Sequence, residues 1–561
     1  MEEKYIGRLI GNTGNPHDLK IVLNDSFAAK RGEFVKIRHV ESHEEGEIYL
    51  LGRIVTVSRS NILYNSNMGE GLNDLEVFPG AQVSGESLFG TIELVGYSDA
   101  SGNIKMPRRP LEPGEKVYGV NYNFLASFYK FDENESINIG NLIGYEKGEN
   151  IVPVYLDVNK LATEHLAILA MTGAGKSYAV GRIIERLVAE MNGTVIVFDV
   201  HGEYGKAFAG GTLHFNEGID KLENPSEIED LKIIIKQFET LQAAGGGIEI
   251  YTPQSESFDF KYAGKNKHLA LQFDRFDMDD MTSVLPGLTE PQQRVLGVAL
   301  RYWKAKYENQ LRDIQDLLDL LGPEGVEELR NWSEISSGEA AALNDRSAAV
   351  VAMKLARLIY EAASFYSVAV GEPTDIYKMA GDKTSKIGKL VIVDMQGLSD
   401  DAKQIVTALI SSEIMRAAMD KERQTRPVFL VFEEGHNFAP ANTPTISKRI
   451  IRKIASEGRK FGVGFSIISQ RPSKLDSDVT SQCNTIITMR LKNPDDQRFI
   501  AKTSDLYSKT DIDELPSLST GEALICGRSI PAPLLVKVGY KALIHGGESP
   551  NVLKVWGKYN G

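Results

Sequence analysis

The sequence predicts an α/β protein in which a β-rich N-terminal domain precedes a parallel sheet covered by helices on both faces. Two observations carry this prediction. The first 100 residues contain short apolar runs separated by glycine, asparagine and aspartate turns, which is typical of a small barrel or sandwich. From residue 166 onward, apolar strands alternate with helices, which is typical of a doubly covered parallel sheet. A length of 561 residues exceeds what one core supports, so at least two domains are expected.

The N-terminal strand pattern is clearest where Ile48 and Leu50 alternate with polar neighbours and Ile54, Val55 and Val57 follow Gly52. The prolines between residues 107 and 113 interrupt regular structure, so this stretch is interpreted as a connecting segment that leads into further extended chain. A domain boundary near residue 150 is expected. The predicted ranges are 1–150 for the barrel-like domain, 151–220 with 385–540 for the sheet domain, 221–384 for a helical insertion, and 541–561 for a tail.

Composition narrows the class of protein. Hydrophobic residues make up 42% and charged residues 25%, no apolar run reaches the roughly 18 residues of a membrane span, and the N-terminus lacks a signal-like core. With only Cys483 and Cys526, a disulfide framework is not expected, so a soluble cytoplasmic protein without a membrane partner is predicted. The net charge of -13 argues against a chain coated with nucleic acid, but it leaves room for basic loops inside a channel.

A glycine loop between residues 170 and 177 carries the strongest motif. The apolar run Leu166 to Ala170 leads into MTGAGKS, and a helix with an apolar stripe follows, which is the strand–loop–helix context of a phosphate-binding P-loop. Backbone amides and the helix N-terminus would cradle the phosphates of ATP, and the hydroxyl at the end of the motif would ligate Mg²⁺. Ala170 replaces the first glycine of the pattern. The predicted nucleotide-binding residues are Thr172, Gly173, Ala174, Gly175, Lys176, Ser177 and Tyr178.

Hydrolysis also requires a carboxylate at the end of another central strand, and three strands offer one. The runs end in Asp199, in Asp394 and in the pair Glu433 and Glu434. The tandem pair is preferred because one carboxylate can hold magnesium while its neighbour orients the attacking water, so Glu433 is assigned to the metal and Glu434 to the water. For Asp199 and Asp394, an ordinary role in the turns that end strands remains equally open.

A second buried strand, Val463 to Ile468, ends in a polar segment. Gln470 there is placed like a sensor of the γ-phosphate, although a glutamine at a strand end is commonly a solvated loop residue. Between residues 220 and 385 the strand pattern is absent. Thr289 is a suitable N-cap and Pro291 suits a first turn, so a helix or helix pair is predicted from Thr289 through Leu321, with Trp303 buried in its apolar stripe.

Taken together, the motifs resemble the HerA branch of the HerA–FtsK P-loop ATPases. The stretches that carry the resemblance are MTGAGKS, VFDVHGEY at 197–204, FEEGHNF at 432–438, EGRKFG at 457–462 and SQRPSKL at 469–475. The N-terminal region similarly looks like the HAS-barrel of that family. The resemblance implies a RecA-like motor domain with an N-terminal barrel.

The resemblance also implies an activity. Such proteins form a homohexameric ring that threads duplex DNA, couples ATP hydrolysis to translocation and works with a NurA-type nuclease in DNA end processing. Transferred to this sequence, Lys176 and Ser177 bind nucleotide and magnesium, Glu434 is the catalytic carboxylate and Gln470 the sensor. Arg459 is the arginine finger offered to the neighbouring subunit; the simpler alternative is that it contacts Glu457 or a DNA phosphate.

The residues that would contact DNA are less clear. Loop lysines and a basic helix are the candidates, with backbone rather than base contacts expected, and a solvated surface is the competing interpretation. The candidates are Lys261, Lys265, Lys267, Lys448, Arg449, Arg452 and Lys453. The tail, with Val552, Leu553, Val555 and Trp556, is a candidate brace for a neighbouring subunit.

Two other functions compete with the motor. A nucleotide-gated ring scaffold that recruits a nuclease or defence effector would keep the P-loop but does not need Glu434. A motor acting on protein or single-stranded DNA, as in secretion or conjugation, would usually carry a membrane anchor, and the sequence shows none.

Overall fold

The computed structural model divides into two compact units. Unit 1 comprises Met1–Asp157, Leu506–Glu514 and Ala523–Val538, and unit 2 comprises Val158–Asp505, Leu515–Glu522 and Gly539–Gly561. The residues that the structure describes are 4–24, 30–41, 46–61, 86–99, 104–129, 134–145, 151–273, 276–308, 312–366, 372–422, 425–503, 507–530, 532–544 and 546–547.

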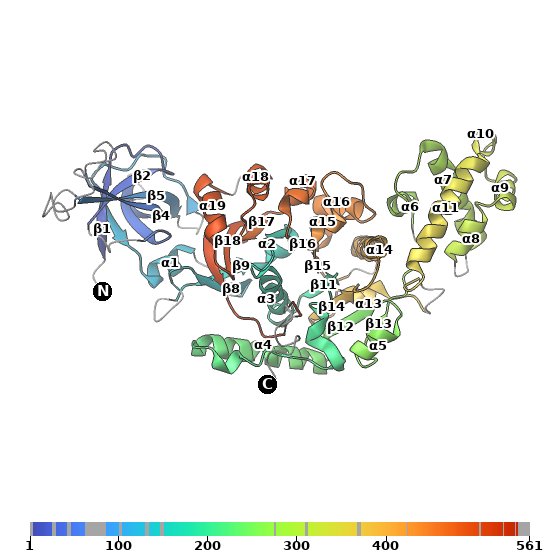
Figure 1. Cartoon of the computed structure of the whole chain (residues 1–561), viewed down its shortest axis with the longest axis horizontal. Helices are drawn as coiled ribbons and strands as arrows, with labels where there is room; N and C mark the ends of the chain where they lie inside the picture. Colours follow the sequence, from blue (N-terminus) through green and yellow to red (C-terminus); the bar gives the residue numbers. More distant parts are fainter. Residues whose placement is uncertain are drawn as a thin grey trace, which may run out of the picture. The chain divides into compact units, whose positions relative to one another are not determined.

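Unit 1 contains an antiparallel barrel. Its strands are β1 Tyr5–Ile10, β2 Leu19–Leu23, β3 Phe34–Val40, β4 Glu47–Asn61, β5 Glu86–Ser98, β6 Ile104–Lys105 and β7 Lys116–Gly119. They pair in the order β2-β1-β7-β3-β4-β5-β6, and a further pairing of β2 with β5 closes the sheet (Figure 1). Residues that alternate toward the interior, including Ile21, Ile37, Leu50 and Ile54, form the fully buried core. The predicted N-terminal barrel is therefore confirmed.

Unit 1 also contains segments that lie outside the barrel. After β7 come α1 (Tyr122–Tyr129), β8 (Ser136–Leu142) and β9 (Pro153–Asp157). Near the C-terminus, β18 (Glu522–Gly527), β19 (Leu534–Val538) and the short helix α19 (Lys509–Glu514) return to this unit, and β19 pairs antiparallel with β8. The predicted range 385–540 places β18 and β19 with the sheet domain, and this division stays a prediction. Pairing between strands so distant in sequence leaves no local pattern.

Unit 2 is built on a parallel sheet. Its strands follow the order β13-β12-β14-β11-β15-β16-β10-β17. Neighbouring strands in this order pair in parallel. The strands are β10 Leu166–Leu169, β11 Thr194–Asp199, β12 Gly247–Thr252, β13 Lys267–His268, β14 Lys389–Asp394, β15 Val428–Phe432, β16 Val463–Ser469 and β17 Thr485–Met489. Their central residues are buried on both faces, as a sheet covered by helices requires.

Helices cover this sheet and extend beyond it. Those associated with the strands are α2 Val158–Thr163, α3 Lys176–Ala189, α4 Pro225–Ala243, α5 Glu256–Lys261, α13 Ile376–Ala380, α14 Asp400–Met419, α15 Gly435–Phe438, α16 Lys448–Glu457, α17 Ser477–Thr480 and α18 Pro494–Thr503. A separate helical group, drawn in yellow-green in Figure 1, consists of α6 Met278–Val284, α7 Glu290–Lys306, α8 Ile314–Asp319, α9 Pro323–Arg330, α10 Ser337–Ala342 and α11 Asp345–Ala362.

The helical insertion differs in extent from the predicted range 221–384. The predicted helix pair is present as α7 and α8: Thr289 caps α7 with a capping box, Pro291 lies in its first turn, and Trp303 is buried with its indole N–H donating to the Asp313 carbonyl at 3.1 Å. However, β12 and β13 lie inside the predicted range and belong to the sheet, with β12 beside β14. The run GIEIYT is short and follows two glycines, so it gave no distinct strand signal.

The described part of the C-terminal segment packs on its own chain. Ala542 and Leu543 donate their N–H groups to the buried carboxylate of Glu185 on α3, at 2.7 and 2.8 Å. Asn216 donates its side-chain amide to the Lys541 carbonyl at 2.8 Å. The four apolar residues predicted to brace a neighbouring subunit, between 552 and 556, lie outside the described residues.

Among the described residues, none of the helices combines the length and apolar character needed to cross a membrane. Cys483 and Cys526 are both buried and unpaired.

Candidate active site

The glycine loop after β10 has the backbone shape that a phosphate cradle needs. Gly173 and Gly175 have φ values of 76° and 98°, in the left-handed region that favours glycine. The loop is also held from outside, since Gly521 donates its N–H to the Ala174 carbonyl at 3.0 Å. Helix α3 begins at Lys176, so its free N–H groups and positive helix end face the loop.

Three predicted site residues meet at the carboxyl edge of the sheet. The Lys176 ammonium donates to Glu434 Oε1 at 2.8 Å, and Gln470 donates its side-chain amide to the same oxygen at 2.6 Å. The Thr172 hydroxyl donates to Gln470 Oε1, which joins the glycine loop to the same network. Because β15, β16 and β10 are neighbours in the sheet, the residues that follow these three strands are brought together.

The backbone around Glu434 fixes its direction. Glu434 has φ 49° and ψ 47°, a left-handed conformation that non-glycine residues rarely adopt. The following residue must be glycine, because a Cβ on Gly435 would lie 2.2 Å from Ile467 Cγ1. Burial raises the pKa of Glu434, but Lys176 and Gln470 outweigh that effect and hold the pKa below its ordinary value. The carboxylate is therefore charged at neutral pH.

Glu433 occupies a different environment at the end of β15. Its side chain is almost fully buried, and its Oε2 has no hydrogen-bond partner among the described residues. Burial and the nearby carboxylates of Asp199 and Glu203 raise its pKa well above the ordinary value, against an opposing effect from Lys176. An unpartnered carboxylate oxygen, with the hydroxyl of Ser177 in the first turn of α3, fits the hard oxygen donors that magnesium prefers.

Asp199 and Asp394 end the neighbouring strands β11 and β14 and are engaged by their own chain. Asp199 accepts three backbone N–H groups, from Glu203, Tyr204 and Gly205, each at 3.0 Å. Burial and the adjacent Asp394 raise the pKa of Asp199 to about 7.

Asp394 is fully buried and has two side-chain donors on one oxygen. Lys261 and the Tyr262 hydroxyl both donate to Oδ2 at 2.6 Å, and the Gln396 N–H donates to Oδ1 at 3.0 Å. These contacts support the structural interpretation of both aspartates.

Two other predicted residues have intramolecular partners. Arg459 lies on the 3₁₀ turn Gly458–Phe461, pairs with Glu164 at 3.1 Å and leaves 61% of its side chain exposed. The Tyr178 hydroxyl accepts the N–H of Lys541 at 3.0 Å, so its ring is engaged by the C-terminal segment. Only the main-chain amide of Tyr178 is then suited to contact a phosphate.

The loop lysines proposed for DNA contact are held within the chain. Lys261 pairs with Asp394, Lys265 donates to the Gly211 carbonyl at 3.1 Å, and Lys267 pairs with Glu249 at 3.0 Å. These contacts favour structural roles for the three lysines.

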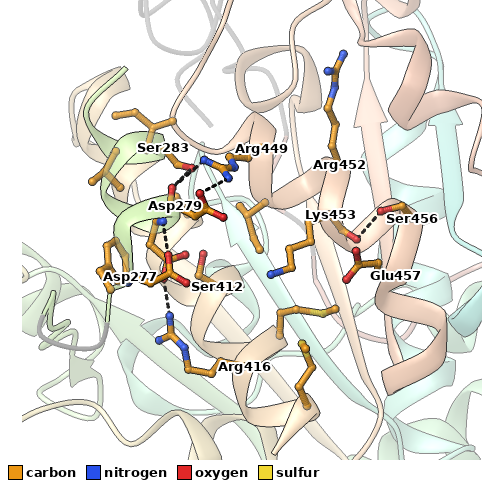
Figure 2. A pocket seen from close by; sticks show the side chains of 18 residues that line it. Asp277, Asp279, Ser283, Ser412, Arg416, Arg449, Arg452, Lys453, Ser456 and Glu457 are labelled. Carbon is orange, nitrogen blue, oxygen red and sulfur yellow. Dashed lines mark hydrogen bonds and ion pairs between the residues drawn. The ribbon is translucent and has the colours of Figure 1, made fainter. Parts of the chain in front are cut away.

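The basic residues of α16 border a pocket of about 550 Å³ between α6, α14 and α16 (Figure 2). Arg449 pairs there with Asp279 at 2.9 Å, and Lys453 points into the hollow. Arg452 also lines the pocket, and it pairs with Asp476 at 2.7 Å, as does Lys448 at 2.8 Å. Three of these four cations therefore already neutralise acidic groups of the same chain.

Two polar residues beside Glu434 received no role from the sequence. His436 Nδ1 lies 3.4 Å from Glu434 Oε2 and 3.2 Å from Ser469 Oγ. His436 lies in the motif FEEGHNF and Ser469 in SQRPSKL. The two side chains come close to Glu434 only because strands β15 and β16 are adjacent.

The parallel sheet, the glycine loop that leads into α3 and the lysine–glutamate pair at the strand ends define a P-loop ATPase. Comparison with known proteins identifies the branch. The model "Helicase HerA, central domain" matches residues 137–414, and the model "HAS barrel domain" matches residues 6–99. The chain belongs to the HerA helicase family and is an ATPase.

Curated relatives match along nearly the whole chain. The DNA double-strand break repair helicase HerA of Pyrococcus furiosus is 28% identical over 99% of this chain and 97% of its own length. The protein of the same name from Saccharolobus solfataricus is 28% identical over 92% of this chain and 90% of its own length. Among solved structures, the bacterial conjugative coupling protein TrwBΔN70 has a TM-score of 0.50 at 12% identity, covering 76% of this chain and 93% of that one, which supports the fold alone.

Proposed function

We propose that this protein is an ATP-driven translocase or helicase on duplex DNA that acts in the processing of DNA ends. The proposal is supported by relatives named as DNA double-strand break repair helicases that match almost the full chain. It is also supported by a site in which the groups needed for phosphoryl transfer to water lie together.

The observation that carries the proposal is that Lys176 and Gln470 both donate to the same carboxylate oxygen of Glu434. In this interpretation Lys176 binds the β- and γ-phosphates, Glu434 orients and deprotonates the attacking water, and Gln470 senses the γ-phosphate. Because Lys176 pairs with Glu434 here, phosphate must draw the ammonium away before the carboxylate becomes available as a base. Nucleotide binding is thereby linked to activation of the glutamate.

Magnesium would be held by Ser177 and Glu433. Because glutamate is longer than the usual aspartate by one methylene, a water can bridge Glu433 to the ion. When bound, the cation would neutralise developing charge on the phosphates. It would also oppose the effect of burial and the neighbouring carboxylates, which raise the pKa of Glu433.

We further propose a homohexameric ring in which Arg459 completes the site of the adjacent subunit. Its side chain is exposed and its partner Glu164 is a single carboxylate, so exchange for a phosphate requires the loss of one ion pair near the surface. A NurA-type nuclease is the proposed partner in end processing. The ring and the nuclease are proposed from the resemblance of the sequence motifs to the HerA branch.

The test is ATP turnover by the full-length protein with and without linear duplex DNA, beside the variant Glu434→Gln. The expected result is stimulation by DNA in the unmodified protein and, in the variant, a loss of about 10²- to 10⁴-fold in kcat because the general base is gone. Glu324→Gln, an exposed residue on α9, is the matched control and should behave as wild type.

Turnover that ignores DNA in the unmodified protein would favour the nucleotide-gated scaffold over the motor. Undiminished turnover by Glu434→Gln would instead show that another group activates the water.

A further inference from the structure

We propose that His436 is a positioning residue for Glu434: it holds the second carboxylate oxygen in place when Lys176 leaves to bind phosphate. The inference rests on the proposed function, because it assumes that Glu434 is the general base. It assigns a role to a side chain that touches the reacting carboxylate without contacting the nucleotide itself.

The two oxygens of Glu434 are held differently. Oε1 accepts from Lys176 at 2.8 Å and from Gln470 at 2.6 Å. Oε2 lies 3.4 Å from His436 Nδ1. Once Lys176 turns toward phosphate, Gln470 remains on one oxygen and His436 is the nearby donor for the other. Two donors on opposite oxygens fix the plane of a carboxylate, whereas one donor leaves it free to rotate.

His436 Nδ1 lies near two oxygens, Ser469 Oγ and Glu434 Oε2. Ser469 Oγ lies 3.2 Å from it and also accepts the Arg471 N–H at 3.0 Å. With the proton on Nδ1, the imidazole can donate to Ser469 or to Glu434 without any change of tautomer. As Lys176 withdraws, the charge on Glu434 loses its cationic partner, so the donor should shift toward the carboxylate.

The backbone around His436 restricts where its imidazole can lie. Helix α15 is a single turn, closed by the Asn437 N–H donating to the Glu434 carbonyl at 2.8 Å and anchored by buried Phe438. Gly435 is pressed against Ile467. Burial lowers the pKa of His436 below the ordinary imidazole value, although Glu434 opposes the shift, so the ring is a neutral donor at pH 7.

The test compares three substitutions in the full-length protein by steady-state ATP turnover and by binding of a fluorescent ATP analogue. Asparagine places an amide donor close to the position of Nδ1, glutamine places it nearer to Nε2, and alanine removes it. For His436→Ala and His436→Gln we expect kcat to fall about 10- to 100-fold, as when a supporting partner of a catalytic group is lost, with KM and nucleotide affinity nearly unchanged. For His436→Asn we expect most of kcat to return.

Equal losses in the asparagine and glutamine variants would overturn the inference, because a purely structural role does not depend on where the donor sits. A wild-type kcat in His436→Ala would also overturn it, as would a rise in KM at constant kcat. If His436→Ala does not fold, the asparagine–glutamine comparison still decides. His17→Ala, at an exposed site in the barrel, is the matched control. Glu434→Gln run alongside separates the two proposals: if it retains wild-type turnover, the proposed function fails independently of His436.

Discussion

Two groups of acidic side chains lie at the carboxyl edge of the same parallel sheet, and they are used differently. In the first, Glu434 faces the glycine loop and pairs with Lys176 at 2.8 Å. In the second, Asp394 pairs with Lys261 at 2.6 Å and accepts the Tyr262 hydroxyl, while the adjacent Asp199 accepts backbone amides. Both groups contain a lysine–carboxylate pair at the end of a buried strand.

The difference lies in what the lysine belongs to. Lys176 is the first residue of a helix that follows a phosphate-shaped loop, so a ligand can compete for it. Lys261 is the last residue of the short helix α5, and its partner Asp394 also accepts further donors from the same chain. The pair therefore attaches α5 to the end of strand β14. We therefore propose that the Lys176–Glu434 pair opens when nucleotide binds, whereas the Lys261–Asp394 pair stabilises the fold.

The largest expected effect comes from exchanging the two lysines for alanine separately. Lys176→Ala should lower ATP turnover by about 10²- to 10³-fold, the typical loss of a charge-stabilising donor, and should also lower stability because it removes the cation that offsets the burial of Glu434. Lys261→Ala should keep turnover within about threefold, a change below 1 kcal/mol in transition-state stabilisation, and lower the free energy of unfolding by about 2 kcal/mol. Turnover assays and urea unfolding distinguish them; a similar kinetic loss in both would remove the distinction.

The pH dependence of stability provides a second test. The pKa of Asp199 is about 7 in the folded protein and ordinarily 3.8, so the folded state retains a proton that the unfolded state releases. Its contribution is fully present below about pH 4 and is lost as pH rises through 7.

We therefore expect the stability deficit of Asp199→Asn to be larger at pH 4.5 than at pH 7.5, by about 3 kcal/mol in urea unfolding. The variant loses one acceptor for backbone amides at every pH, so the informative quantity is the change in the deficit. A deficit that stays constant between pH 4.5 and 7.5 would show that Asp199 is charged across this range.

The smallest effect is expected for Tyr262→Phe, which removes one hydroxyl donor from buried Asp394 and leaves Lys261 in place. Loss of a hydrogen bond to a charged group should cost about 2 kcal/mol in the free energy of unfolding. The kcat for ATP should not change. A clear fall in kcat without a change in stability would place the second group in the chemistry after all.

Much of the sheet domain was predictable because its signals are local. The glycine loop, the strands ending in Asp199, Asp394 and Glu433, and the N-cap at Thr289 can each be recognised within about ten residues, and the structure contains each of these elements. The short strand β12, which follows two glycines, gave a weaker local signal and was placed in the helical insertion. The return of β18 and β19 to unit 1 depends on pairing across most of the chain, which local patterns do not encode.

What the amino-acid sequence by itself determined is the chemical inventory: a phosphate-binding loop, a tandem pair of glutamates, a polar strand end and the family resemblance that joins them. Tertiary structure alone decided which carboxylate meets which cation. Strand order places β16 between β15 and β10, and so brings Glu434, Gln470 and His436 to Lys176. Asp199 instead accepts amides of the loop that follows it, and Asp394 pairs with Lys261 of α5. The physical reason is that periodicity and capping act between near neighbours, whereas partners at a sheet edge are set by the order in which buried strands pair.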